Sequence, residues 1–219
     1  MKDAEQLRNE YNKRFSSDKN LWGSENIRHC LSIAKKVSVY SKQNQKKGLT
    51  LLDVGCATGF FTKAFSKLGY NAYGLDYSEV AIVKASNYHP ECHFLHGDGF
   101  NPTIKNTFDL IFCKGFSGAN THDLEFVASW ANKYIKILNH NGVFVFSYSS
   151  NFTGKEKAEE TVNWAKDEIE SFIKLINAKC IGVKIFYQYG IVSRLLEAFQ
   201  MIIRRKRIKR YFYIFLKKE

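Results

Sequence analysis

The chain has 219 residues, of which 45% are hydrophobic and 15% aromatic, so it can bury one substantial core but has little material for a second domain. Residues 1–15 lack the apolar centre of a secretory signal, and the longest apolar runs are too short to cross a bilayer, which argues against export and against an integral membrane protein. The five cysteines are widely spaced and form no CxxC pair, so we expect reduced thiols in the cytoplasm and neither a disulfide framework nor a metal site.

The formal net charge of +12 is concentrated near the end of the chain. Residues 201–219 contain eight Lys or Arg and one Glu, which gives +7 and leaves +5 for all other residues. Such a basic cluster is typical of contacts with phosphates, with an anionic membrane surface or with an acidic substrate, but a solvated charged turn has the same composition.

The first half of the chain alternates apolar runs with segments of helical periodicity. Residues 49–54 form an apolar run that ends at glycine, and residues 60–68 follow with helical spacing, which predicts a strand that leads into a helix through a tight turn. Ser78 is suited to cap the next helix. The further elements expected are a strand at 71–76, a helix at 80–88, a strand at 93–96 and a buried strand at 108–113.

The second half continues the alternation. The expected elements are a helix at 123–138 broken at 139–142, a strand at 142–148, a long helix at 155–178, a strand at 179–189, a helix at 192–203 and a strand at 211–216. Val162 and Ala165 are among the residues expected on the buried face of the long helix. Strict alternation of this kind favours an α/β fold with an open, mostly parallel sheet and helices on both faces.

In such sheets ligands bind outside the carboxyl ends of the strands, so the residues that follow each strand are the candidates for a site. The first strand ends in Asp53-Val-Gly55-Cys56-Ala57-Thr58-Gly59. Two glycines let the backbone approach a ligand closely, and their spacing behind an acidic residue differs from the GxGxxG turn that holds a pyrophosphate. The turn therefore suits a cofactor with a positively charged amino-acid end.

Acidic residues also end the second and third strands. Asp76 is placed to accept hydrogen bonds from a ribose diol, with Tyr77 beside an adenine ring. Asp98, Gly99 and Phe100 supply an acceptor for an exocyclic amino group and a second aromatic face. Each carboxylate has an alternative interpretation. Asp53 and Asp76 could cap helices or bind another nucleotide, and Asp98 could belong to an ordinary turn.

Together these motifs resemble the class I S-adenosylmethionine-dependent methyltransferases. The resemblance rests on LLDVGCATG at 51–59, YGLDYSE at 73–79, LHGDGF at 95–100, FDLIFCKG at 108–115 and GVFVFSY at 142–148. It is specific over roughly residues 48–150 and elsewhere depends only on the order of the elements. The cofactor that it implies is S-adenosyl-L-methionine, with S-adenosyl-L-homocysteine as the product.

The resemblance implies a role for each strand end. Asp53 and the turn from Gly55 through Cys56 and Ala57 to Gly59 would surround the methionine end of the cofactor. Asp76 would hold the ribose, and Asp98 with the Gly99 amide would contact adenine. Cys113 and Lys114 would lie near the sulfonium and the acceptor, although a cysteine at the end of a strand is also a common core residue.

The family fold is a Rossmann-like three-layer sandwich with a seven-stranded sheet in the order 3-2-1-4-5-7-6, whose last strand is antiparallel. We therefore expect one domain over 1–219, with a helical lid at 1–45, a cofactor-binding core at 46–150, and helices and strands with a basic segment at 151–219. Tyr11, Arg14, Phe15 and Trp22 are candidates for the lid, and Arg14 would pair with the methionine carboxylate.

Methyl transfer from a sulfonium is an in-line displacement, which needs alignment of the acceptor and exclusion of water. Both O- and N-methylation are open: a neutral amine acceptor needs little more, whereas a hydroxyl acceptor gains from a general base. His122, after the fourth strand, is the candidate base, although a surface or helix-capping histidine fits the same position. Asp123 is expected to cap the following helix. No NPPY-type sequence follows the fourth strand, which argues against the family members that methylate exocyclic amines of bases or glutamine. The general form of the chain favours a small-molecule or surface-glycan acceptor.

Two other functions remain open from the sequence. The basic residues at 204–210 would also suit a tRNA or rRNA methyltransferase, which predicts RNA binding that depends steeply on salt. A cofactor-binding partner or sensor without catalytic activity, with its basic aromatic end on an anionic membrane, is the third interpretation. The sequence does not determine the oligomeric state.

Overall fold

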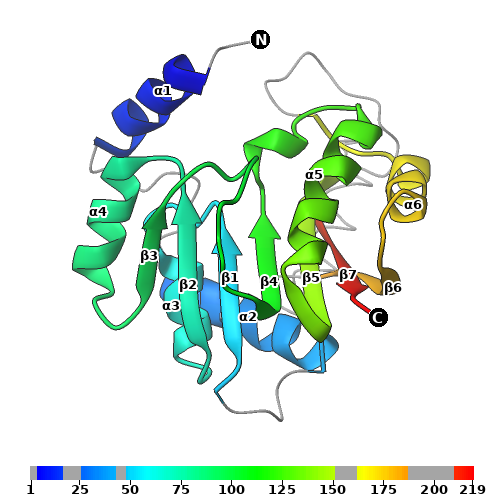
Figure 1. The fold of residues 1–219 in the computed structure, drawn as a ribbon, viewed down its shortest axis with the longest axis horizontal. Coiled ribbons are helices and arrows are strands. Elements are labelled where there is room, and N and C mark those ends of the chain that lie inside the picture. The colour runs from blue at the N-terminus through cyan, green and yellow to red at the C-terminus, as the bar shows by residue number, and fades with distance from the viewer. Residues whose placement is uncertain (1–3, 17–25, 43–47, 151–161, 187–209) are drawn as a thin grey trace, which may run out of the picture.

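A computed structural model describes residues 4–16, 26–42, 48–150, 162–186 and 210–219 (Figure 1). Its helices are α1 (Ala4–Ser16), α2 (Ile27–Tyr40), α3 (Phe60–Ser66), α4 (Glu79–Tyr88), the 3-10 turn η2 (Ser117–Ala119), α5 (Leu124–Lys136) and α6 (Lys166–Lys174). Its strands are β1 (Thr50–Val54), β2 (Asn71–Asp76), β3 (His93–His96), β4 (Phe108–Lys114), β5 (Leu138–Ser150), β6 (Lys179–Ile185) and β7 (Arg210–Lys217). None of the helices in these ranges is long and apolar enough to cross a bilayer.

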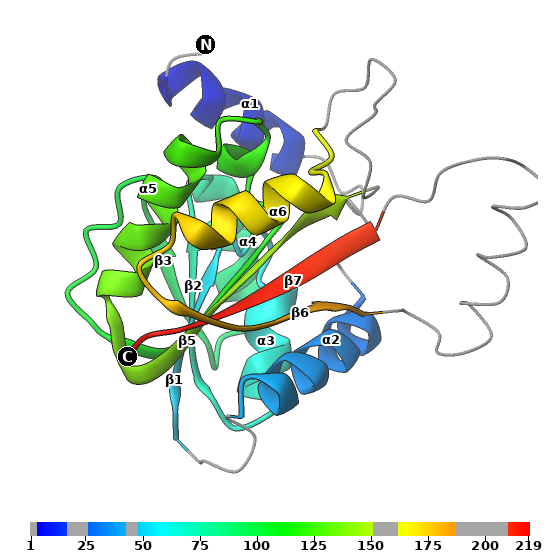
Figure 2. The ribbon, with the colours of Figure 1, turned by 90° about the vertical axis from the view of Figure 1, so that its right-hand side faces the viewer.

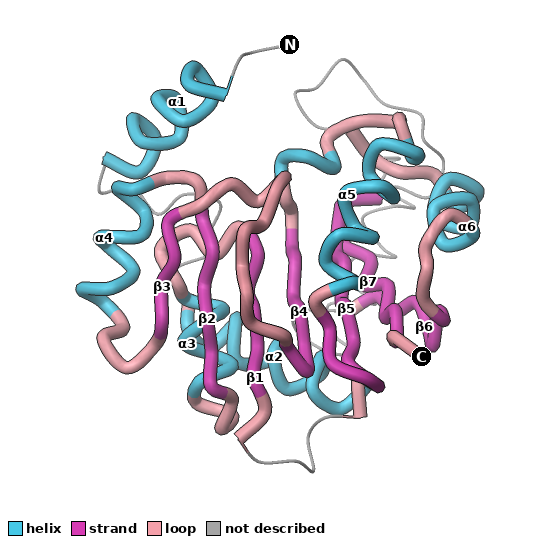
Figure 3. The backbone as a smooth tube through the Cα atoms, in the orientation of Figure 1, coloured by secondary structure: helices cyan, strands magenta, loops and turns pink. Residues whose placement is uncertain are grey.

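The seven strands form one sheet in the order β3-β2-β1-β4-β5-β7-β6 (Figure 3). Strands β1 to β5 pair in parallel, whereas β7 is antiparallel to both β5 and β6. The expected sheet order and the antiparallel last strand are therefore confirmed. The central strands carry apolar side chains on both faces because helices cover both faces of the sheet.

Helices cover the sheet in two layers (Figure 2). On one face α2 and α3 pack against β1, β4 and β5 through a cluster that includes Val37, Phe65 and Phe112. On the other face α5 and α6 pack through a cluster that includes Trp130 and Phe172. Every one of these five side chains is at most 3% exposed, so burial of apolar surface on both faces stabilises the three-layer sandwich.

The two helices of the expected lid segment lie in different places. Helix α2 belongs to the core layer, because Cys30, Ile33 and Val37 are buried against the sheet. Helix α1 instead lies over the carboxyl edge of the sheet beside α4 (Figure 1). The hydroxyl of Ser78, which caps α4, donates a hydrogen bond of 2.7 Å to the side chain of Asn12 in α1.

The prediction of a long helix at 155–178 is wrong over the described residues 162–178, where the helix α6 covers only Lys166–Lys174. Residues 162–164 have no regular secondary structure, and the Trp164 amide donates to the Ser149 carbonyl of β5. Glu168 accepts a hydrogen bond of 2.7 Å from the Ala165 amide, which fixes the first turn of α6 at that point. Val162 and Ala165, which were expected on a buried helix face, are only half-buried, and the buried residues of this stretch are Asn163 and Trp164.

Strand β5 is longer than expected because the sequence Asn139-His-Asn-Gly142 does not break it. The register against β4 shifts instead, from Phe108 opposite Leu138 to Leu110 opposite Val143, so these residues form an irregularity within the strand. The helix expected at 192–203, the basic residues 204–209 and Trp22 lie outside the described residues.

Candidate functional site

The carboxyl ends of β1, β2, β3 and β4 meet along one edge of the sheet, where the loop of residues 55–59 (the glycine loop) follows β1. Its backbone is left-handed at Gly55, Ala57 and Gly59, with φ values of 72°, 50° and 81°. The amides of Gly55 and Cys56 both donate to the Leu75 carbonyl, which holds the loop against the end of β2. The loop is therefore a fixed part of the edge.

The two glycines of this loop are required for different reasons. A Cβ atom at Gly59 would lie 2.6 Å from the ring of Phe94, so no larger residue fits there without a shift. Gly55 is exposed, and a Cβ there would have only the Phe116 ring within 4 Å, at 3.6 Å. Gly55 therefore leaves an open surface on which a ligand can approach the backbone.

Asp53 lies at the base of the glycine loop and is 3% exposed. Its carboxylate accepts a hydrogen bond of 2.7 Å from the hydroxyl of Thr62 on α3. Burial raises the pKa of Asp53 to about 7; the nearby charge of Asp76 adds to this, whereas the bond from Thr62 opposes it. A cationic group beside Asp53 would lower the free-energy cost of burying the negative charge of this carboxylate, so the site favours a ligand with a positive charge.

Asp76 ends β2 and is held by the backbone on both sides. One carboxylate oxygen accepts from the Ala57 amide at 2.9 Å, and the other accepts from the Ser78 amide at 2.9 Å. Burial raises its pKa, and these amide hydrogen bonds oppose the rise. Because each carboxylate oxygen has a further lone pair, Asp76 retains the capacity to accept two hydroxyl donors such as a ribose diol.

The turn after β3, at residues 97–101, is held by hydrogen bonds of its own residues and of α5. Asp98 accepts from the Phe100 amide at 2.8 Å and from the Asn101 side chain at 3.2 Å. The Gly99 carbonyl accepts from the indole of Trp130 and from the hydroxyl of Tyr134, each at 2.7 Å. These bonds fix the turn after β3, and Tyr77 is joined to it because His96 hydrogen-bonds with the Tyr77 carbonyl at 3.1 Å.

Phe116 is a residue of this edge that the sequence analysis did not identify. It stacks on Trp130 with ring centroids 4.6 Å apart, and its ring lies near both Gly55 and Gly99. The ring of Phe100 lies 5.0 Å from it, so the two form an apolar wall between the glycine loop and the turn after β3. Its signal in the sequence is an aromatic residue directly after Gly115, whose φ is 69°.

Cys113 and Lys114 project to opposite faces of the sheet because side chains alternate along a strand. Cys113 is fully buried in the α5 layer, where burial raises the pKa of its thiol, so the structure does not bring it to the accessible edge. Cys56 is also buried, beside Gly74 of β2. Lys114 is partly accessible, and its ammonium group lies over the ring of Tyr211, 4.0 Å from the ring centroid.

Tyr11 and Arg14 lie on α1. Arg14 forms an ion pair with Glu10 one turn earlier and lies 5.7 Å from the Tyr11 ring centroid. Its side chain is 44% exposed, so the structure gives Arg14 a partner on its own helix. A role for Arg14 with a cofactor carboxylate stays a prediction.

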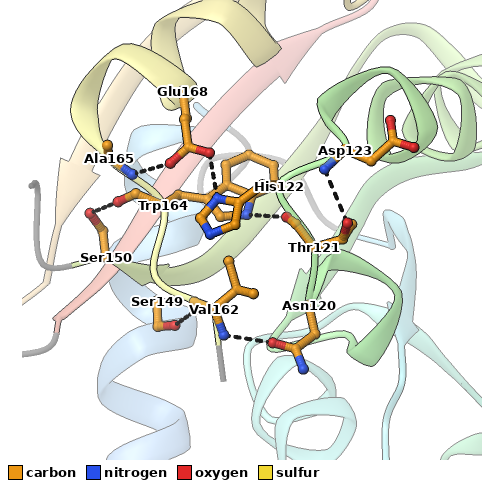
Figure 4. Close-up of polar contacts among 10 residues, drawn as sticks. All are labelled: Asn120, Thr121, His122, Asp123, Ser149, Ser150, Val162, Trp164, Ala165 and Glu168. Carbon is orange, nitrogen blue, oxygen red and sulfur yellow. Dashed lines mark hydrogen bonds and ion pairs between the residues drawn. The ribbon is translucent and has the colours of Figure 1, made fainter. Parts of the chain in front are cut away.

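His122 is hydrogen-bonded to Glu168 of α6 (Figure 4). Its Nδ1 lies 2.6 Å from a carboxylate oxygen of Glu168, whose other oxygen accepts from the Ala165 amide. The neighbouring Thr121 carbonyl accepts from the indole of Trp164 at 3.1 Å. Asp123 caps α5 as expected, through the Phe126 amide. Loop 120–123 and segment 162–168 therefore form one hydrogen-bonded unit beside the carboxyl edge.

A separate open hollow of about 690 Å³ lies at the opposite, amino edge of the sheet. Lys136, Lys179 and Lys218 are among its lining residues, and none of the strand-end residues described above borders it. In the described part of the chain, no group of three or more His, Cys, Asp or Glu side chains is arranged to hold a metal ion.

Comparison with known proteins gives a family and a fold. A family model described as "Methyltransferase domain" matches residues 45–211. The chain is 28% identical over 166 residues to the malonyl-[acyl-carrier protein] O-methyltransferase of Buchnera aphidicola, a match that covers 68% of this chain and 62% of that protein. It is 26% identical over 82 residues to the mitochondrial ubiquinone biosynthesis O-methyltransferase of Schizosaccharomyces pombe, over 34% of this chain and 30% of that protein.

Among solved structures, a magnesium protoporphyrin IX methyltransferase from Synechocystis with bound S-adenosylhomocysteine has a TM-score of 0.67 at 13% identity. The match covers 99% of this chain and all of that one. At this identity the likeness supports the fold.

Proposed function

Because the chain belongs to the family of methyltransferase domains, we propose that it transfers a methyl group from S-adenosylmethionine to an oxygen of a small-molecule acceptor. The observation that carries the proposal is the meeting of Asp53, the open backbone at Gly55 and Asp76 along one edge of the sheet. S-adenosylmethionine has a cationic amino-acid end and a ribose diol, and each needs one of these carboxylates.

The residues present fit that cofactor. Asp53 offers a buried carboxylate with a raised pKa, which an amino group would stabilise in its charged form. Asp76 is fixed by two amides and retains acceptor capacity for the ribose. The Phe100 and Phe116 rings form an apolar wall on the side where adenine is expected.

The acceptor is proposed from the comparisons and from the form of the edge. Both curated relatives are named as O-methyltransferases, and the chain spans less than two thirds of the length of each, so their substrates are guides only. A surface-glycan sugar remains within the proposed class. The unit of loop 120–123 and segment 162–168 would border the acceptor, because it follows the end of β4.

Transfer requires the chain to align the acceptor oxygen with the methyl group and to exclude water. His122 is our candidate for the proton acceptor, since Glu168 orients its ring through Nδ1 in the manner of a carboxylate that positions a histidine base. The cofactor supplies the reactive methyl group when it is bound.

The test is to incubate the pure protein with isotope-labelled S-adenosylmethionine and fractions of a cell extract, and to identify the labelled species by mass spectrometry. Asp76→Ala should abolish labelling. Glu170→Ala, which removes an exposed carboxylate from α6, is the matched control and should retain labelling. Labelling that persists in Asp76→Ala would contradict the ribose assignment, and no labelled product in any fraction would contradict methyl transfer.

A further inference from the structure

Helix α2 presents a basic face to the solvent. Its buried side, which includes Val37, packs on the sheet, and Arg28, Lys35 and Val39 recur on the opposite, exposed side of the helix. Residues 26–42 contain four Lys or Arg and no Asp or Glu. Among the described residues, neither Arg28 nor Lys35 forms an ion pair.

The end of β6 extends this basic face. Tyr40, at the end of α2, stacks on Phe186, directly after β6, with ring centroids 5.5 Å apart. The ammonium group of Lys184 lies 5.1 Å from the Tyr40 ring centroid, and that of Lys36 lies 5.8 Å from the Phe186 ring centroid. Contacts between α2 and the end of β6 therefore hold cations and apolar side chains in one area on the outside of the sandwich (Figure 2). The α2 surface, as we call it, consists of Arg28, Lys35, Lys36, Val39, Tyr40 and Lys184.

Positive charge distinguishes this face of the sandwich from the other one. Helices α2 and α3, which cover this face, contain four Lys or Arg and no acidic residue. Helices α5 and α6, on the other face, contain four Lys and four Asp or Glu. The formal charge is therefore +4 for the first pair of helices and zero for the second. Only Lys63 of the first pair has a printed acidic partner, Glu91, so the charge of this face is complementary to a broad anionic surface.

We propose that the α2 surface binds an anionic lipid membrane. Lys and Arg side chains at the surface of a protein are attracted by the negative potential of anionic headgroups. Val39 and Tyr40 are 55% and 45% exposed, and such side chains beside cations are suited to the boundary between headgroups and acyl chains. The α2 surface shares no residue with the glycine loop, Asp53 or Asp76, so membrane binding is separate from the proposed function.

Nucleic acid fits the α2 surface less well than lipid does. Proteins that bind single strands stack bases on exposed aromatic rings. The ring of Tyr40 already contacts Phe186 and Lys184, and the exposed side chain beside it is the aliphatic Val39. An aliphatic side chain gains from contact with lipid and not from contact with phosphate.

The test is cosedimentation of the full chain with vesicles of phosphatidylcholine alone, and with vesicles that contain about one third phosphatidylglycerol. The wild type should bind only the anionic vesicles, and binding should weaken as the salt concentration rises. Each cation near an anionic surface strengthens binding about fivefold, so the triple variant Arg28→Gln/Lys35→Gln/Lys184→Gln should bind about a hundredfold more weakly. Val39→Ser, which changes no charge, should bind severalfold more weakly.

The matched control is the triple variant Lys105→Gln/Lys166→Gln/Lys174→Gln, which loses the same charge from exposed positions outside the α2 surface. It should bind anionic vesicles within about threefold of the wild type, because charges more than a Debye length from the membrane are screened. If the α2 triple variant does not fold, Lys35→Glu, which changes the charge by two units at one exposed position, should weaken binding about twentyfold.

Four results would overturn the proposal. The first is a wild type that does not bind anionic vesicles. The second is an equal loss in the two triple variants, which would assign binding to net charge or to the basic residues at 204–210. The third is unchanged binding by Val39→Ser, which would remove the lipid contact. The fourth is binding of transfer RNA that is lost in the α2 triple variant while vesicle binding is not, which would assign the surface to nucleic acid.

Discussion

Replacing Asp53 with asparagine should stabilise the protein above neutral pH and weaken its binding of cofactor. Burial raises the pKa of Asp53 from 3.8 to about 7, and a carboxyl whose folded-state pKa is raised destabilises the folded protein as pH rises through that interval. At about 1.36 kcal/mol per pKa unit, the full cost of ionisation is at most about 4 kcal/mol. Roughly 2.6 kcal/mol of this cost falls between pH 5 and pH 8, and the asparagine side chain does not ionise.

The assay is thermal unfolding of wild-type protein and Asp53→Asn at pH 5 and pH 8, without cofactor. Between pH 5 and pH 8, the melting temperature of Asp53→Asn should rise by roughly 5–10 °C relative to that of the wild type. In calorimetry at pH 8, the same variant should bind S-adenosylhomocysteine about tenfold or more weakly, because a charged hydrogen-bond partner has been removed. Glu79→Gln, an exposed carboxylate in the first turn of α4, is the control for loss of charge alone.

Two results would refute this reasoning. If wild type and Asp53→Asn change stability in parallel from pH 5 to pH 8, Asp53 does not carry the cost of a buried charge. If the variant binds S-adenosylhomocysteine as tightly as the wild type does, Asp53 does not hold the amino-acid end.

Three further predictions concern the loop, the cap of α4 and the proposed base. Gly59→Ala should destabilise the protein by at least about 1 kcal/mol more than Gly48→Ala in urea unfolding, since both have positive φ but only Gly59 has a ring within 3 Å of a new Cβ; equal losses would refute the clash. Ser78→Ala removes both the α4 cap and the bond to Asn12, so it should lower the free energy of unfolding by about 1–2 kcal/mol in urea unfolding. If α1 is a lid, Ser78→Ala should also weaken S-adenosylhomocysteine binding, whereas Asp123→Ala, which removes the cap of α5, should not; equal binding by the two variants would refute the lid. His122→Ala should lower kcat about a hundredfold or more on the acceptor found by labelling, with little change in cofactor affinity; an unchanged kcat would remove His122 from the mechanism.

The sheet and the cofactor edge follow from local features of the sequence. Apolar runs such as 50–54 and 108–114 are buried on both faces, and each ends where a glycine or an acidic residue appears. Such runs predict parallel strands, and the carboxyl ends of parallel strands meet at one edge. The positions of Asp53, Asp76 and the glycine loop could therefore be predicted, and the resemblance in motifs supplied the strand order that the structure confirms.

Contacts between distant segments were decided only by the tertiary structure. Residues 162–165 continue the helical periodicity of the residues that follow them, but residues 162–164 are not helical, because they form hydrogen bonds to β5 and to loop 120–123. His122 follows β4 in the sequence, and only packing of α6 against α5 brings Glu168 within 2.6 Å of it. The separation of Cys113 from Lys114 depends on which helix covers each face of the sheet. Periodicity along the chain records which side chains are apolar, whereas the partner of a polar side chain is set by which elements pack together.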